Sequence, residues 1–199
     1  MLLFSLFNLF LFAFLPPVFW LAYFLKKDIH PEAKRNIIFA FLGGGVITIP
    51  TFFIENFLLK IPLPFNGFLV LLITSFLFVG LVEELMKFSV FKFGVQNQPF
   101  LDEPVDYLIY MITIALGFAA FENIITFTHY NVEQELQASA IVSIIRFWGP
   151  NLLHSLCSGM LGFFIFISRL KKKKILFLLG LALASALHGI FNLLIINID

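Results

Sequence analysis

The sequence predicts an all-α, polytopic membrane protein with about six transmembrane helices around a polar intramembrane cavity. The first observation is composition, because 60% of the 199 residues are hydrophobic, 13% are charged, and the mean hydropathy is +0.99. The second is a set of six apolar runs, each long enough to cross a bilayer, which takes about 20 residues. The third is the presence of ionisable residues inside those runs, where they need a shared polar interior. We therefore expect one integral membrane domain over residues 1–199.

The apolar runs place the helices near residues 2–25, 36–59, 65–93, 105–128, 139–168 and 175–198. The first run is expected to be retained, because no lysine or arginine precedes Lys26 and no small-residue cleavage site follows it. Pro16-Pro17 should kink or break that helix midway. A net charge of +1 argues against nucleic acid as a partner, and the single cysteine, Cys157, excludes an intrachain disulfide.

Charged residues are distributed unequally between the two sets of connections. One set carries Lys26, Lys27, Lys34, Arg35, Lys92, Arg169 and Lys171 to Lys174, whereas the other has only Lys60, Arg146, Glu133 and Glu135. By the positive-inside rule the basic loops face the cytoplasm and both termini are extracytoplasmic. This pattern predicts a multi-pass protein of the cell membrane, typical of a bacterial or archaeal inner membrane. Binding of anionic lipid is a secondary reading of the same lysines.

Two adjacent carboxylates and a lysine interrupt the third apolar run, which is uncharged from Phe65 to Val82. A charge at bilayer depth costs at least ~2.5 kcal/mol, so Glu83, Glu84 and Lys87 indicate a functional site. Glu83 and Lys87 are four residues apart and share a helix face. We expect Lys87 to neutralise one carboxylate while the other points elsewhere.

Further polar residues lie within the later spans: Glu122, Asn123, Arg146, Asn151, His154, His188 and Asn192. Because each would be costly in lipid, we expect them to face one hydrated cavity. Phe118 lies four residues before Glu122, on the same face, and Gly149-Pro150 should loosen the helix before His154.

Several of these residues also have structural readings. Glu122 and Asn123 can hold helices together, and Arg146 can extend to the outer interface. Small residues at Ser155, Ser158, Gly159 and Gly162 are best explained by close helix packing. Glu55, His30 and His129 are expected to be bystanders. The acidic loop before the fourth helix is expected to be solvated, with Asp106 able to cap that helix.

A carboxylate with two histidines and amide side chains suggests activation of water. A glutamate can act as general base, while a histidine or an asparagine orients water and stabilises an oxyanion. His154, His188 and a glutamate are also a possible zinc set, although no His-Glu-x-x-His motif supports it. The alternative from another class is a non-catalytic membrane protein that uses the cluster for binding, transport or immunity.

Four blocks between residues 80 and 195 resemble the PrsW family of intramembrane proteases. They are Glu83-Glu84-Leu-Met-Lys87, Asp102 to Asp106 running into Gly117 to Asn123, Arg146 with His154 and Gly162, and His188-Gly-Ile-Phe-Asn192. That family is similar to the CAAX-processing and bacteriocin-processing membrane proteases, whose blocks are a double glutamate, Phe-x-x-x-His and His-x-x-x-Asn. Here Phe118 and Glu122 take the second block, with glutamate in place of histidine.

The resemblance implies hydrolysis of a peptide bond in a membrane-anchored protein, for which anti-sigma factors are the associated substrates. It implies a catalytic centre of Glu83, Glu84, His154, His188 and Asn192, supported by Lys87, Phe118, Glu122, Asn123 and Arg146. Zinc is left open as a cofactor, since the family is commonly called metalloprotease while its relatives suggest glutamate-activated water. The expected partners are the lipid bilayer and a membrane-anchored protein substrate.

Overall fold

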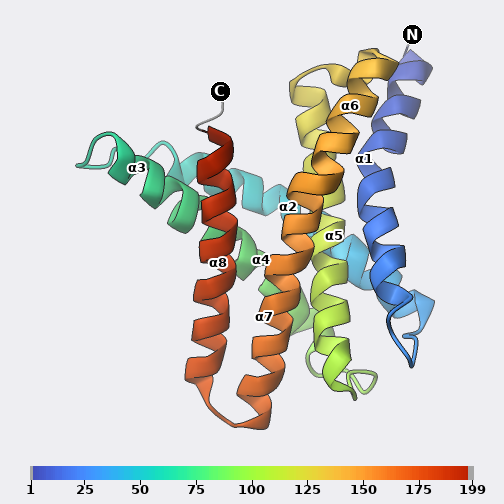
Figure 1. Ribbon diagram of the computed structural model, residues 1–199, viewed down its shortest axis with the longest axis vertical. Helices are drawn as coiled ribbons and strands as arrows, with labels where there is room; N and C mark the ends of the chain where they lie inside the picture. Colours follow the sequence, from blue (N-terminus) through green and yellow to red (C-terminus); the bar gives the residue numbers. More distant parts are fainter. Residues whose placement is uncertain (1, 197–199) are drawn as a thin grey trace.

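The computed structural model describes residues 2–196, within which the chain forms helices and no strands (Figure 1). Six helical segments of this part of the chain are long and apolar enough to cross a membrane. The predicted all-α class and the predicted number of spans are therefore confirmed.

Four spans are single helices and two are composite. The single helices are α1 (Leu2–Leu25), α2 (Lys34–Leu58), α5 (Pro104–His129) and α8 (Lys174–Ile196). The third span joins α3 (Phe68–Ile73), a π-helical segment (Thr74–Leu81), α4 (Val82–Val90) and a second π-helical segment (Phe91–Val95). The fifth span joins α6 (Leu136–Arg146), a π-helical segment (Phe147–Asn151) and α7 (Leu152–Leu170), after a 3₁₀ turn at Val132–Gln134. The predicted end of the last helix, at 198, lies outside the described residues.

Helix α5 is the centre of the bundle, because 72% of its apolar 18-residue stretch is buried. Two glycines allow its neighbours to approach closely. A β-carbon at Gly117 of α5 would overlap the backbone carbonyl of Phe41 in α2, and one at Gly162 of α7 would overlap that of Tyr107 in α5. The prediction that Gly162 serves close helix packing is confirmed, and α5 is held firmly between α2 and α7.

Regular α-helix is interrupted at one of the two positions where the sequence predicts an irregular helix. The segment around Gly149-Pro150 is π-helical, which confirms the predicted loosening before His154. A longer π-helical segment, which the sequence did not predict, ends at Leu81 and leads directly into the two glutamates. Such segments are frequent at functional sites. Of the two expected effects of Pro16-Pro17, a break is wrong, since α1 continues through both prolines, and a kink stays a prediction.

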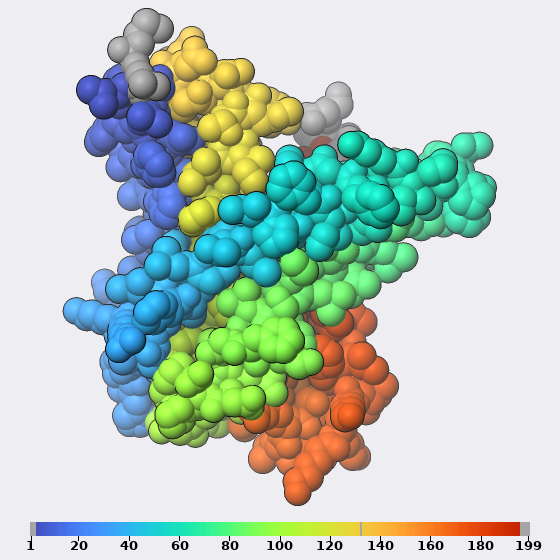
Figure 2. All heavy atoms as spheres, turned by 180° about the vertical axis from the view of Figure 1, so that it is seen from behind, coloured from blue at the N-terminus to red at the C-terminus, as the bar shows by residue number. Residues whose placement is uncertain are grey.

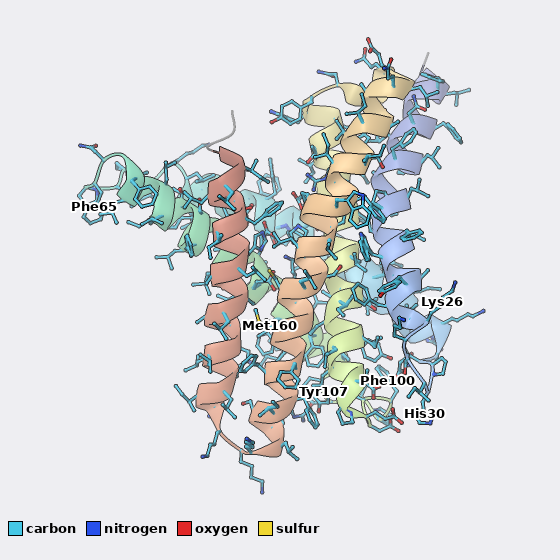
Figure 3. All side chains as sticks on the ribbon, viewed as in Figure 1. Lys26, His30, Phe65, Phe100, Tyr107 and Met160 are labelled. Atoms are coloured by element: carbon cyan, nitrogen blue, oxygen red, sulfur yellow. The ribbon has the colours of Figure 1, made fainter. Side chains whose placement is uncertain are left out.

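Both ends of the described chain lie at the same end of the bundle, at the top of Figure 1. The connection that carries Lys26 and His30 lies at the opposite end, as does the turn between α7 and α8 (Figure 3). Seen from behind, α2 crosses this face diagonally and the region around α3 projects from the body (Figure 2). The two sets of loops are therefore separated as a six-span topology requires. The cytoplasmic location of the basic loops stays a prediction.

The acidic loop before α5 contacts the loop between α1 and α2, because Glu103 Oε1 lies 2.7 Å from His30 Nδ1. Asp106 is buried and its Oδ2 accepts hydrogen bonds from the backbone N–H groups of Glu103 (2.6 Å) and Asp102 (3.0 Å). Tyr110 donates a hydrogen bond of 2.6 Å to Glu32, and burial raises the pKa of Glu32. Asp106 thus forms part of the capping box at the start of α5, as the sequence allowed.

Candidate active site

Helix α4 supplies a buried triad of two carboxylates and one ammonium group. Lys87 Nζ lies 3.0 Å from Glu83 Oε2 and 2.9 Å from Glu84 Oε1, and none of the three side chains is more than 8% exposed. The expectation that one carboxylate pairs with Lys87 while the other points elsewhere is wrong, because the ammonium group contacts both. Positions three and four residues before a lysine both lie within reach of its long side chain on a helix. Lys87 also lies 4.5 Å from the centroid of the Phe118 ring, which covers it from α5.

His154, at the start of α7, bridges this triad to a second carboxylate. Its Nδ1 lies 2.9 Å from Lys87 Nζ, and its Nε2 lies 2.8 Å from Glu122 Oε2 on α5. Because an ammonium group can only donate, Nδ1 is the acceptor and Nε2 carries the proton that is donated to Glu122. Both ring nitrogens are therefore occupied, and the tautomer is fixed by its neighbours.

Arg146 supports Glu122 from behind. Its Nη2 lies 2.9 Å from Glu122 Oε1 as an ion pair without hydrogen-bond geometry, and its Nε donates a short hydrogen bond to Asn123 Oδ1. Asn151 donates a hydrogen bond of 2.8 Å to the backbone carbonyl of Arg146. The reading of Arg146 as an interfacial residue is wrong, because these partners hold its side chain inside the bundle, where it is only 10% exposed.

His188 approaches the carboxylate pair from α8 and is held less closely. Its Nδ1 lies 3.4 Å from Glu84 Oε1 and its Nε2 lies 3.7 Å from Glu83 Oε1. The rings of His154 and His188 meet nearly at right angles, with centroids 5.0 Å apart. His188 therefore keeps hydrogen-bonding capacity beside Glu83.

A cavity of about 390 Å³ opens onto this cluster. Of the predicted site residues, seven line it: Glu83, Phe118, Glu122, Arg146, His154, His188 and Asn192. Glu84, Lys87 and Asn123 are each fully buried and are not among the residues that line it. The structure thus brings the predicted residues together in two layers and distinguishes the glutamates, because Glu83 faces the cavity and Glu84 lies behind it.

Two residues near the cluster were assigned other roles from the sequence. Ser158 was expected only to allow close packing, yet it donates a hydrogen bond of 2.8 Å to Glu84 Oε2. Glu55 of α2 was expected to be a bystander, yet it lines the cavity, and its buried Oε1 has no hydrogen-bond partner among the described residues. The available signal for Glu55 was that it is the one charged residue in the apolar run 36–59.

Glu83, His154 and His188 offer ligand atoms within 4.8 Å of one another. Two histidines and one carboxylate are a set that catalytic zinc uses, so the donors fit in kind and in proximity. His154 Nδ1, however, is 3.7 Å from Glu83 and only 2.9 Å from Lys87 Nζ. A metal ion held by this nitrogen would therefore compete with the Lys87 ammonium for it.

Comparison with known proteins gives a consistent family assignment. The sequence profile described as "PrsW family intramembrane metalloprotease" matches residues 32–199. The chain belongs to the PrsW family. Proteins named Protease PrsW share 29% identity over 184 residues in Bacillus subtilis (strain 168), covering 90% of this chain and 79% of the relative, and 26% over 196 residues in Clostridioides difficile (strain 630), covering 94% and 79%.

A third PrsW protease, from Geobacillus kaustophilus (strain HTA426), is 29% identical over 184 residues, covering 91% of this chain and 76% of its own. No solved structure matches the chain. Membership of the PrsW family identifies a multi-pass membrane protease. The match to the family begins at residue 32 and so includes α2, whereas the motifs recognised in the sequence began only at residue 80.

Proposed function

We propose that this PrsW protease is an intramembrane endopeptidase that hydrolyses a peptide bond in a membrane-anchored protein, with Glu83 as the general base. The observation that carries the proposal is that Glu83 is the glutamate of the pair that lines the cavity, with a nitrogen of each histidine 3.7 Å from its carboxylate. An anti-sigma factor is the substrate class that the family resemblance implies.

The proposed reaction begins with a water molecule beside Glu83. Glu83 removes a proton as the water oxygen attacks the carbonyl carbon of the scissile bond, which places a negative charge on the carbonyl oxygen. His188 and the amide of Asn192 are the proposed donors to this oxyanion, since both line the same cavity. Glu83 then returns the proton to the leaving nitrogen as the C–N bond breaks, so that atoms and charge balance.

The buried layer has a different role in this proposal. Lys87 forms an ion pair with both Glu83 and Glu84, and Ser158 donates a hydrogen bond to the second oxygen of Glu84. His154 and Glu122 complete the frame and keep the Lys87 ammonium in place. A zinc ion would be held by Glu83, His154 and His188, and would supply polarisation of a bound water molecule.

The test is cleavage of a single-span test substrate by detergent-purified protein, with the metal content of the same preparation measured. We expect the wild type to cut the substrate and Glu83→Gln/Glu84→Gln to lose cleavage. The control is Glu135→Gln, which removes an exposed carboxylate in a loop. Full proteolysis by the double variant would falsify the proposal.

The metal measurement assigns the chemistry of the same cleavage. Stoichiometric zinc, with cleavage lost on chelation and restored by zinc, would assign Glu83, His154 and His188 as ligands. Cleavage by metal-free protein would assign Glu83 as the direct base. Substrate binding without cleavage by the wild type, with or without added zinc, would favour a non-catalytic binding role.

A further inference from the structure

Two adjacent prolines lie in the middle of α1 and leave two backbone carbonyls without helical partners. Proline has no N–H, so Pro16 cannot bond the carbonyl of Phe12, and Pro17 cannot bond that of Ala13. At membrane depth a carbonyl without a donor is costly, and another group has to supply one. Ser143 donates a hydrogen bond of 3.1 Å to the Phe12 carbonyl, and Asn123 donates one of 2.7 Å to the Ala13 carbonyl. These two bonds explain how α1 continues through the prolines.

The Ala13 carbonyl is the first member of a chain of contacts that ends at His154. Asn123 Nδ2 donates to Ala13, and Asn123 Oδ1 accepts from Arg146 Nε. Arg146 Nη2 pairs with Glu122 Oε1 at 2.9 Å, and Glu122 Oε2 lies 2.8 Å from His154 Nε2. Hydrogen bonds and one ion pair therefore connect a backbone atom of α1 to a ring in the candidate active site.

The amide of Asn123 makes this chain directional. An amide has one accepting end and one donating end, and only one of its two orientations suits both neighbours. With its nitrogen on the Ala13 carbonyl, its oxygen faces the guanidinium group of Arg146. The opposite orientation would set an oxygen against a carbonyl and an NH₂ group against a cation that can only donate. The free Ala13 carbonyl therefore favours the orientation that Arg146 needs, together with Asn151 Oδ1, which accepts a longer hydrogen bond of 3.3 Å from the same Asn123 nitrogen.

We propose that Pro17 is a positioning residue for His154, acting through Ala13, Asn123, Arg146 and Glu122. Helix α1 is then part of the catalytic frame, although it lies before residue 32, where the match to the family begins. Pro16 has a different effect, because the carbonyl it frees docks Ser143, which takes no part in the chain to His154. This inference rests on the proposed proteolytic function for its kinetic readout only.

The test compares Pro17→Ala with Pro16→Ala. Alanine at position 17 restores an N–H that bonds the Ala13 carbonyl and competes with Asn123. We expect Pro17→Ala to lower kcat about three- to tenfold, the worth of one such hydrogen bond, with KM unchanged. Pro16→Ala should keep kcat within about twofold, since its hydrogen bond lies off the chain. Both variants should unfold no earlier than the wild type, because alanine favours helix over proline.

A second readout does not depend on cleavage. The imidazole ¹⁵N chemical shifts of His154, assigned by loss of its signals in His154→Gln, should move in Pro17→Ala and stay in Pro16→Ala. Pro17→Ala should also add nothing to the kcat loss of Asn123→Ala. Unchanged His154 shifts in Pro17→Ala, or equal changes in both proline variants, would overturn the proposal. If the wild type fails to cleave while Pro17→Ala alone moves the His154 signals, the positioning role stands and the proposed protease chemistry fails.

Discussion

His154 and His188 reach the same pair of carboxylates from neighbouring helices, yet they are held in different ways. Both side chains are nearly fully buried. His154 makes contacts of 2.9 Å and 2.8 Å, one at each ring nitrogen. His188 comes no closer than 3.4 Å to Glu84 and 3.7 Å to Glu83. A distance of 3.7 Å is too long for a hydrogen bond, so one nitrogen of His188 remains available beside Glu83.

The difference separates a fixed histidine from an available one. His154 has no nitrogen left for a water molecule unless Lys87 or Glu122 moves away, and its contribution is to hold those groups in place. His188 and the neighbouring Asn192 line the cavity with unused hydrogen-bonding capacity. Two histidines that look equivalent in the sequence thus differ through what lies around them.

The largest effect on this arrangement should come from Lys87→Met, which removes the charge that the carboxylates and His154 share. Two buried carboxylates would be left without a cation, and we expect the free energy of unfolding to fall by about 3–5 kcal/mol. The measurement is reversible unfolding in mixed detergent micelles. Lys92→Met is the control, because Lys92 lies in the same span and is exposed.

The triple variant Lys87→Met/Glu83→Gln/Glu84→Gln makes the Lys87 prediction specific. Neutral amides remove the unpaired charge, so this variant should regain more than half of the lost stability. Wild-type stability in Lys87→Met, or no recovery in the triple variant, would contradict a shared buried ion cluster.

The next effect compares the two histidines directly. His154→Ala leaves Glu122 and Lys87 each without one partner, and we expect it to lower the free energy of unfolding by about 1–3 kcal/mol. His188→Ala removes longer contacts and should cost less than about 1 kcal/mol. Both variants should lose cleavage of the single-span substrate. Equal destabilisation by the two substitutions would show that the shorter contacts of His154 do not stabilise the protein more than the longer contacts of His188.

The fold could be predicted from the sequence because each span is a long apolar run. The site could be predicted because ionisable residues in such runs are costly. Boundaries inside the spans were less accessible. The π-helical segment before Glu83 has no proline, and its course depends on neighbours such as α8, whose Ser185 carbonyl would lie 2.8 Å from a β-carbon at Gly80. Tertiary contacts of this kind leave no local pattern in the sequence.

The contacts between side chains within the site could not be predicted from the sequence for a related reason. Helical spacing placed Glu83 and Lys87 on one face, but it did not specify that Lys87 also reaches Glu84 and His154. Arg146 looked interfacial from its position in the span, because Asn123 and Glu122, which hold it inside, lie on another helix. Spacing predicts neighbours along one helix, whereas partners across helices depend on how the helices pack.

The smallest effect should come from Glu55, which lines the cavity from α2. Like His188, it has hydrogen-bonding capacity that no described residue uses. Its buried Oε1 has no partner among the described residues, and a substrate backbone N–H entering the cavity needs an acceptor. Glu55→Leu should raise KM about three- to tenfold with kcat unchanged, while Glu55→Gln, which keeps the acceptor, should stay within about twofold. Asn56→Leu is the control, since the neighbouring Asn56 bonds the Phe52 carbonyl of its own helix. If Glu55→Leu lowered kcat and left KM unchanged, Glu55 would act on the reacting groups. Its free acceptor would then not serve substrate binding alone.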